Sequence, residues 1–180
     1  LRRRRKLGQG LLQPAARVEA ETEENLEPAA AWTTARVLVV DDNHTNLMVA
    51  QGQCQKLGHE VLTAESGTEA IAVLLGTARM PQVILMDCEM PDMDGFETTT
   101  EIRRLQGEGR IPDIPVVALT AHAVPDKIRA CHNAGMITHI AKPVSRQKLG
   151  REIERALHNE SGPPDNALQS RAGWTPRSPP

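Results

Sequence analysis

Four short apolar runs in this chain each end in a polar or charged residue, and this pattern limits the fold more than any other feature. The runs and the residues that follow them are 37–40 before Asp41 and Asp42, 83–86 before Asp87, 116–119 before Thr120, and 139–141 before Lys142. Apolar runs of this length, separated by helical stretches, are typical of buried parallel strands. Because ligand sites of parallel sheets lie at the carboxyl ends of the strands, these end residues are expected to meet at one edge.

A further strand at residues 60–64 and five helical stretches complete an alternation of strands and helices. The helices are expected to begin near Asn43, Ser66, Phe96, Pro125 and Ser145. Five such alternations predict an α/β fold with a doubly wound, five-stranded parallel sheet and helices on both faces. Right-handed crossovers with the first strand near the centre give the strand order 2-1-3-4-5, which places Asp41, Asp42 and Asp87 on neighbouring strand ends.

The two ends of the chain differ in composition from its middle. Residues 1–35 begin with a basic run and become rich in alanine and glutamate, and residues 159–180 are rich in proline with few aliphatic side chains. Such segments bury too little apolar surface to offset the entropy lost on ordering. We therefore expect residues 1–35 to be a linker, disordered or partly helical, residues 36–158 to be the folded domain, and residues 159–180 to be a disordered tail.

Charge and cysteine content exclude several classes of protein. The formal net charge of -2 argues against a nucleic-acid binder, whose domain would be clearly basic. Cys54, Cys88 and Cys131 are an odd number without paired spacing, which favours free thiols in a reducing compartment over a disulfide framework. No apolar stretch approaches the ~20 residues needed to cross a bilayer, so we expect no membrane insertion by this segment.

The clustered end residues suggest phosphoryl chemistry. Three carboxylates at one edge repel one another, and a hard divalent cation with oxygen ligands, Mg²⁺, relieves that repulsion. One carboxylate can then act as a nucleophile toward phosphorus, while Lys142 and the Thr120 hydroxyl neutralise or bind the phosphoryl oxygens. Pro143 follows Lys142, and the sequence leaves open whether the bond between them is cis or trans.

These motifs together resemble a known family. They are Asp-Asp-Asn at 41–43, Met-Asp at 86–87 followed by Met-Pro at 90–91 and Asp-Gly at 94–95, Leu-Thr-Ala at 119–121, and Lys-Pro at 142–143. In this order and spacing, residues 36–158 resemble the response regulator receiver domain of two-component phosphorelays, which has a flavodoxin-like fold. The amino-acid sequence at residues 86–91 and 134–143 is most similar to the receiver segments of hybrid sensor histidine kinases.

The resemblance implies a role for each site residue. Asp87 would be the phosphoacceptor, Asp42 would bind Mg²⁺ directly, and Asp41 would assist through water. The backbone carbonyl of Glu89 would complete the metal site, and Thr120 and Lys142 would contact the phosphoryl group and pass the signal on.

His139 departs from the family pattern, because an aromatic switch residue is usual at its position. Two interpretations stay open: His139 is a half-buried strand residue, or its protonatable ring couples switching to pH.

For the whole chain, the resemblance implies Mg²⁺-dependent transfer of a phosphoryl group from phosphohistidine to Asp87. Its partners would be a histidine kinase dimerisation domain or a histidine phosphotransfer domain, without nucleic acid. The location would be cytoplasmic, and the parent chain would be a histidine kinase. Whether that parent chain is anchored in the inner membrane is open. Whether this segment is itself an enzyme is also open, since it would have at most self-phosphorylation and self-dephosphorylation activity.

Three alternatives are a degenerate receiver that binds partners constitutively, a stand-alone response regulator, and an aspartate-nucleophile phosphatase. The phosphatase would need an acid two residues after a nucleophile near the first strand, which Asp-Asp-Asn at 41–43 lacks.

Overall fold

The computed structural model describes residues 32–122 and 124–158. The expected tail at 159–180 and all but the last four residues of the expected linker lie outside the described residues. The strands are β1 (Arg36–Val40), β2 (Glu60–Ala64), β3 (Val83–Asp87), β4 (Val116–Thr120) and β5 (Thr138–Ala141). The helices are α1 (His44–Lys56), α2 (Gly67–Gly76), α3 (Gly95–Gly107), α4 (Pro125–Asn133) and α5 (Arg146–Leu157).

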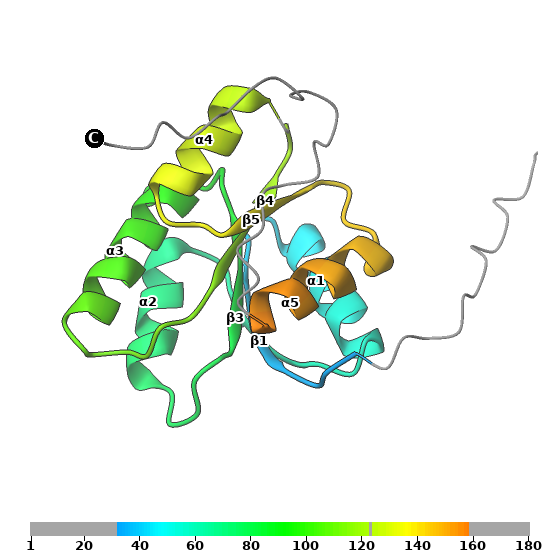
Figure 1. Ribbon diagram of the computed structural model, residues 1–180, viewed down its shortest axis with the longest axis horizontal. Helices are drawn as coiled ribbons and strands as arrows, with labels where there is room; N and C mark the ends of the chain where they lie inside the picture. The colour runs from blue at the N-terminus through cyan, green and yellow to red at the C-terminus, as the bar shows by residue number, and fades with distance from the viewer. Residues whose placement is uncertain (1–31, 123, 159–180) are drawn as a thin grey trace, which may run out of the picture. The chain divides into compact units, whose positions relative to one another are not determined.

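The five strands form one parallel sheet in the order β2-β1-β3-β4-β5, with α2, α3 and α4 on one face and α1 and α5 on the other (Figure 1). The predicted topology is confirmed. None of the helices that the structure describes is long and apolar enough to span a lipid bilayer.

Alternation along the strands creates two separate cores. In β1, Leu38 and Val40 face α2 and α3, while Val37 and Val39 face α1 and α5. Successive strand side chains point to opposite faces, so a strand covered on both sides must be apolar throughout. This requirement explains why β3 and β4 are buried along their whole length, and why their polar end residues are confined to the sheet edge.

The loop between β3 and α3 turns back tightly against the end of β3. A Cβ atom on Gly95 would lie 2.1 Å from the backbone oxygen of Asp87, so only glycine fits at this position. Asp94 is the N-cap of α3 and accepts hydrogen bonds from the backbone N–H groups of Phe96 and Glu97. These contacts fix the loop beside Asp87.

Residues 32–35 make contacts with the folded domain, although the sequence placed them in the linker. The Trp32 ring packs against Gly150 of α5, and Thr33 donates two hydrogen bonds to the Glu154 carboxylate, at 3.1 and 2.7 Å. Ala35 is buried, and its N–H donates to Nδ1 of His59 at 3.3 Å. Residues 32–35 thus contact the domain that is expected to begin at residue 36. Composition does not reveal these contacts, because the surface that receives Trp32 lies at Gly150 of α5.

Candidate functional site

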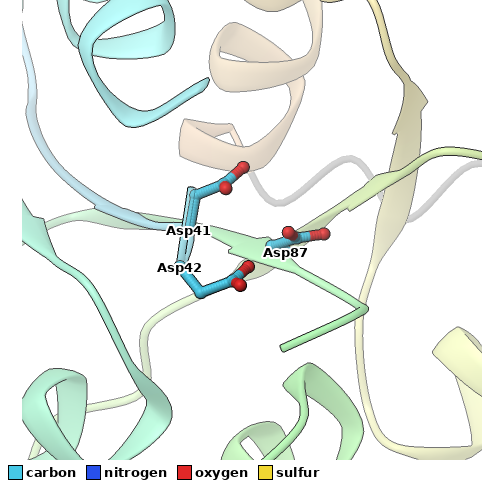
Figure 2. Close-up of side chains that lie close together, drawn as sticks. All are labelled: Asp41, Asp42 and Asp87. Carbon is cyan, nitrogen blue, oxygen red and sulfur yellow. The ribbon is translucent and has the colours of Figure 1, made fainter. Parts of the chain in front are cut away.

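Three carboxylates meet at the carboxyl end of the sheet. Asp41 and Asp42 directly follow β1, and Asp87 ends β3, the neighbouring strand. One oxygen from each carboxylate lies within 4.8 Å of the others (Figure 2). Asp41 and Asp87 are buried, whereas Asp42 is exposed. The structure thus brings together the three acids that the sequence selected as metal ligands.

Lys142, which follows β5, joins two of these acids. Its Nζ lies 2.7 Å from Oδ2 of Asp41 and 2.9 Å from Oδ2 of Asp87. Burial alone would lower the pKa of Lys142, but the hydrogen bonds to both carboxylates outweigh that effect and raise it. Burial raises the pKa of Asp87, and Lys142 opposes this rise. The Lys142–Pro143 peptide bond is cis.

The remaining carboxylate oxygens accept hydrogen bonds from nearby loops. Oδ1 of Asp41 accepts from the backbone N–H of Asn43 at 2.9 Å and from the side-chain amide of Asn46 at 3.4 Å. Oδ1 of Asp87 accepts from the backbone N–H of Glu89 at 3.3 Å. Asn46 was not among the site residues selected from the sequence, although its place in the first turn of α1, just beyond the acid pair, could have indicated this contact.

Thr120 lies at the same edge, but its hydroxyl is engaged elsewhere. The hydroxyl donates to the backbone oxygen of His122 at 3.0 Å and accepts from the His122 N–H at 3.2 Å. The backbone N–H of Lys142 donates to the oxygen of Thr120 at 2.8 Å. Thr120 would therefore have to leave the turn after β4 before its hydroxyl could bind a phosphoryl oxygen.

Glu89 connects the loop after β3 to α4. Its side chain forms an ion pair with Lys127, and this pair lowers the pKa of Glu89. No local sequence pattern indicates this pair, because 38 residues separate its members. Nothing in the described contacts tests the backbone carbonyl of Glu89 as a metal ligand, so that role stays a prediction.

His139 is half-buried on β5, opposite Ala118 of β4. Its Nδ1 is buried and finds no hydrogen-bond partner among the residues that the structure describes. Burial lowers the pKa of the ring, and the nearby charges of Lys148 and His132 lower it further. The lowered pKa favours the neutral form of the ring. A switching role for His139 stays a prediction.

The donor set at the acidic edge suits a hard divalent cation. One carboxylate oxygen from each of Asp41, Asp42 and Asp87 lies within 4.8 Å of the others, and no histidine or cysteine ligand joins this cluster among the described residues. Mg²⁺ prefers oxygen ligands from a few carboxylates and retains several waters. The exposed side chain of Asp42 leaves room for those waters.

Comparison with known sequences agrees with this fold. The family model of the response regulator receiver domain matches residues 37–154, and the chain belongs to that family. Its curated relatives include the sensor protein GacS of Pseudomonas syringae pv. syringae, 34% identical over 154 residues, and histidine kinase 3 of Arabidopsis thaliana, 35% identical over 143 residues. The alignments cover 83% and 70% of this chain but only 17% and 14% of those relatives. The chain is thus similar to the receiver segments of hybrid histidine kinases.

Solved structures show the same architecture. The chemotaxis protein CheY4 of Vibrio cholerae superimposes with a TM-score of 0.62 at 29% identity, covering 69% of this chain and all of that one. The receiver domain of the sensor histidine kinase PA1611 of Pseudomonas aeruginosa PAO1 gives a TM-score of 0.60 at 32% identity, covering 70% of this chain and 99% of that one. That structure contains a magnesium ion in its active-site cleft.

Proposed function

We propose that Asp87 is the residue of this receiver domain that accepts a phosphoryl group from a phosphohistidine. The observation that carries the proposal is the position of Lys142, whose ammonium holds the carboxylates of Asp41 and Asp87 together at the carboxyl edge of the sheet. A buried carboxylate beside a fixed cation is prepared for attack on an anionic phosphoryl group, because the approach of two anions is otherwise repulsive.

In the proposed step, a carboxylate oxygen of Asp87 forms a bond to phosphorus as the bond from phosphorus to the histidine nitrogen breaks. The electron pair of that bond stays on the imidazole nitrogen. The products are an acyl phosphate on Asp87 and, because the other ring nitrogen of the phosphohistidine carries a proton, a neutral histidine on the donor. The protein supplies positioning and positive charge rather than a proton.

The cation proposed for this site is Mg²⁺, held by Asp41, Asp42, Asp87 and the backbone carbonyl of Glu89. When bound, it would neutralise charge on the phosphoryl oxygens. The magnesium ion in the related PA1611 receiver supports this choice. Of the three acids, Asp42 is the exposed one, so its carboxylate can give up water and bind the cation. Buried Asp41 is already hydrogen-bonded to Asn43, Asn46 and Lys142.

After transfer, Lys142 would turn from the free carboxylate of Asp87 to a phosphoryl oxygen. Thr120 would leave His122 to donate its hydroxyl to a second oxygen. Since the backbones of Thr120 and Lys142 are hydrogen-bonded to each other, movement of one strand end is transmitted to the other. The change would then reach His139, which lies on β5 beside β4.

We also propose that this receiver is part of a hybrid sensor histidine kinase in the cytoplasm. Its phosphoryl donor or acceptor would be the kinase dimerisation domain or a histidine phosphotransfer domain. Support comes from the curated relatives, which are histidine kinases much longer than this chain. The complete set of acids and lysine argues against a receiver that acts without phosphorylation.

The proposal is tested by incubating the chain with Mg²⁺ and acetyl phosphate and measuring its intact mass. We expect the gain of one phosphoryl group, which requires Mg²⁺ and is lost in Asp87→Asn. Asp92→Asn, in the exposed loop after β3, is the matched control and should gain the same mass. Modification of Asp87→Asn equal to that of the wild type would contradict the proposal, and rapid multiple turnover of phosphoesters would favour a phosphatase.

A further inference from the structure

Two cysteines from distant parts of the chain meet beside the phosphoacceptor. Cys88 directly follows Asp87, and Cys131 lies on α4, 43 residues later. Their Sγ atoms are 3.8 Å apart, and the two residues are only 1% and 2% exposed. The sequence had favoured three unpaired thiols because the spacing showed no pairs. The fold creates a pair that spacing cannot show.

The geometry of this pair requires little change to form a covalent bond. A disulfide has a sulfur–sulfur distance of about 2.05 Å, so the two atoms would have to approach by roughly 1.8 Å. The backbone of Cys88 is fixed, because its N–H donates to Leu119 at 3.0 Å and its oxygen accepts from Gly95 at 3.3 Å. Any approach must therefore come from α4.

Helix α4 is the element best able to make that approach. Cys131 is its one buried residue among those that the structure describes, and its N-cap residue, Val124, makes no side-chain capping hydrogen bond. Elements with few buried contacts open and shift at a small cost in free energy. A small movement of α4 away from the sheet would admit a small oxidant. Its return toward β3 would close the remaining distance between the sulfur atoms.

We propose that Cys88 and Cys131 form a reversible intramolecular disulfide that ties the loop after β3 to α4. The oxidant would be a peroxide. The sulfur of one cysteine attacks a peroxide oxygen, the oxygen–oxygen bond breaks, and a sulfenic acid and water are produced. The second sulfur then attacks the sulfenic sulfur and expels the oxygen as a second water, so that two thiols are oxidised by two electrons as one peroxide is reduced.

The environments of the paired cysteines differ from that of Cys54. The hydrogen bond with Cys88 lowers the pKa of Cys131, and the nearby charge of Lys127 acts in the same direction. Cys54 provides a contrast within the same chain, because it is buried on α1 in the other core and burial raises its pKa to about 12. The two cysteine environments therefore predict selective oxidation.

The expected consequence for signalling rests on the proposed function. A disulfide would draw α4 toward β3 and hold the Glu89–Lys127 pair against the loop beside Asp87. Oxidation should then slow phosphorylation of Asp87, and reduction should restore the rate. The disulfide itself can be detected without any phosphoryl donor, so its failure to form is distinguishable from failure of the proposed function.

The test is to treat the reduced chain with hydrogen peroxide, denature it, alkylate the remaining thiols and count the additions by mass. Untreated protein should show three alkylated cysteines, and oxidised protein should lose two of them without forming dimers. Dithiothreitol should restore both. Peptide mapping should find Cys88 joined to Cys131.

Three variants isolate the pair. Cys54→Ala should still form the bond and lose both of its thiols, whereas Cys88→Ala and Cys131→Ala should form no intramolecular disulfide. Free glutathione in a parallel tube, given the same peroxide, shows that the peroxide was effective. The proposal is overturned if all three wild-type thiols survive conditions that oxidise the glutathione, if Cys54 takes part, or if the bond joins separate chains.

Discussion

The acceptor edge, defined as Asp41, Asp42, Asp87 and Lys142, differs sharply from the α4 side, defined as α4 and β5. At the acceptor edge, the Lys142 ammonium lies 2.7–2.9 Å from the buried carboxylates of Asp41 and Asp87, and Asp87 ends β3, which is buried along its whole length. On the α4 side, a nine-residue helix buries only Cys131 among its residues, and a histidine nitrogen on β5 lacks a partner within the described residues. One region is fixed by direct polar contacts, and the other is held weakly.

This difference suggests how the two tasks of a receiver are divided. Acceptance of a phosphoryl group needs preorganised charge, which costs no reorganisation at the moment of transfer. Passing on a signal needs an element with two arrangements of similar free energy. The acceptor edge has such preorganised charge, and α4, with one buried residue, is the element that we expect to change its arrangement.

The largest expected effect compares two lysines, one from each region. In Lys142→Met, the buried carboxylates of Asp41 and Asp87 lose their partner, and breaking a buried pair costs about 3–5 kcal/mol of unfolding free energy. Lys127→Met removes only the ion pair with exposed Glu89 and should cost about 1 kcal/mol or less. Urea unfolding in the presence of a chelator measures both losses.

Addition of Mg²⁺ sharpens this test of the two lysines. A cation at the acceptor edge replaces part of the lost positive charge, so Mg²⁺ should recover part of the stability of Lys142→Met. It should change Lys127→Met no more than the wild type. Equal losses in the two variants would show that the acceptor edge is not held more firmly than the α4 side.

A smaller effect is expected at His139. Removing its unpartnered buried nitrogen in His139→Phe should stabilise the protein at neutral pH, by no more than about 1 kcal/mol because the ring is only half-buried. The folded-state pKa of His139 lies below the unfolded value of about 6.5, so its neutral form is favoured by folding.

The sign of the pH dependence follows from that depressed pKa. Above about pH 6.5, His139 is neutral in both the folded and the unfolded chain, and its titration takes no stability from the protein. As the pH falls toward the folded-state pKa, the unfolded chain binds the proton first, so the free energy of unfolding decreases. His139→Phe should therefore lose less stability than the wild type between neutral and mildly acidic pH in urea unfolding. An unchanged slope would remove His139 as a source of pH dependence. In His139→Phe, the effect of phosphorylation on the affinity for a binding partner should likewise not change with pH.

The smallest expected effect concerns Gly150, where the Trp32 ring packs against α5. A Cβ atom at Gly150 would lie 2.9 Å from two carbons of the Trp32 ring, so Gly150→Ala must displace the indole. Gly52→Ala on α1 meets nothing within 4 Å and should gain about 0.5–1 kcal/mol from helix propensity. Gly150→Ala should gain less than Gly52→Ala.

Fluorescence separates the two glycine variants further. In a Trp174→Phe background, Gly150→Ala should shift the emission of Trp32 to longer wavelength as the ring becomes more exposed, whereas Gly52→Ala should leave it unchanged. If both variants gave the same emission and the same gain in stability, Trp32 would not anchor α5.

Features set by a short stretch of sequence were predictable. The bounds of β1 and β2 match the structure because each apolar run is limited by polar residues, and the crossover rule fixed the strand order. The convergence of Asp41, Asp42 and Asp87 followed from that order, since all three end neighbouring strands.

Contacts between distant segments were not predictable in the same way. The Cys88–Cys131 and Glu89–Lys127 contacts depend on how α4 lies over the end of β3, and no local pattern encodes the position of a helix on a sheet. Composition places Trp32 in the linker, because residues 1–35 offer little apolar surface to bury, while the surface that receives Trp32 belongs to α5. The hydrogen bonds between Thr120 and His122 depend on the path of the turn after β4.

The most direct measurement of the central claim is to locate the phosphoryl group. After incubation with Mg²⁺ and a phosphohistidine donor, borohydride reduces an acyl phosphate to an alcohol, and peptide mass spectrometry identifies the modified residue. We predict reduction at Asp87 alone, with Asp41 and Asp42 intact in the same sample. Reduction at either of those two residues, or at none of the three while the donor loses its phosphoryl group, would contradict the assignment.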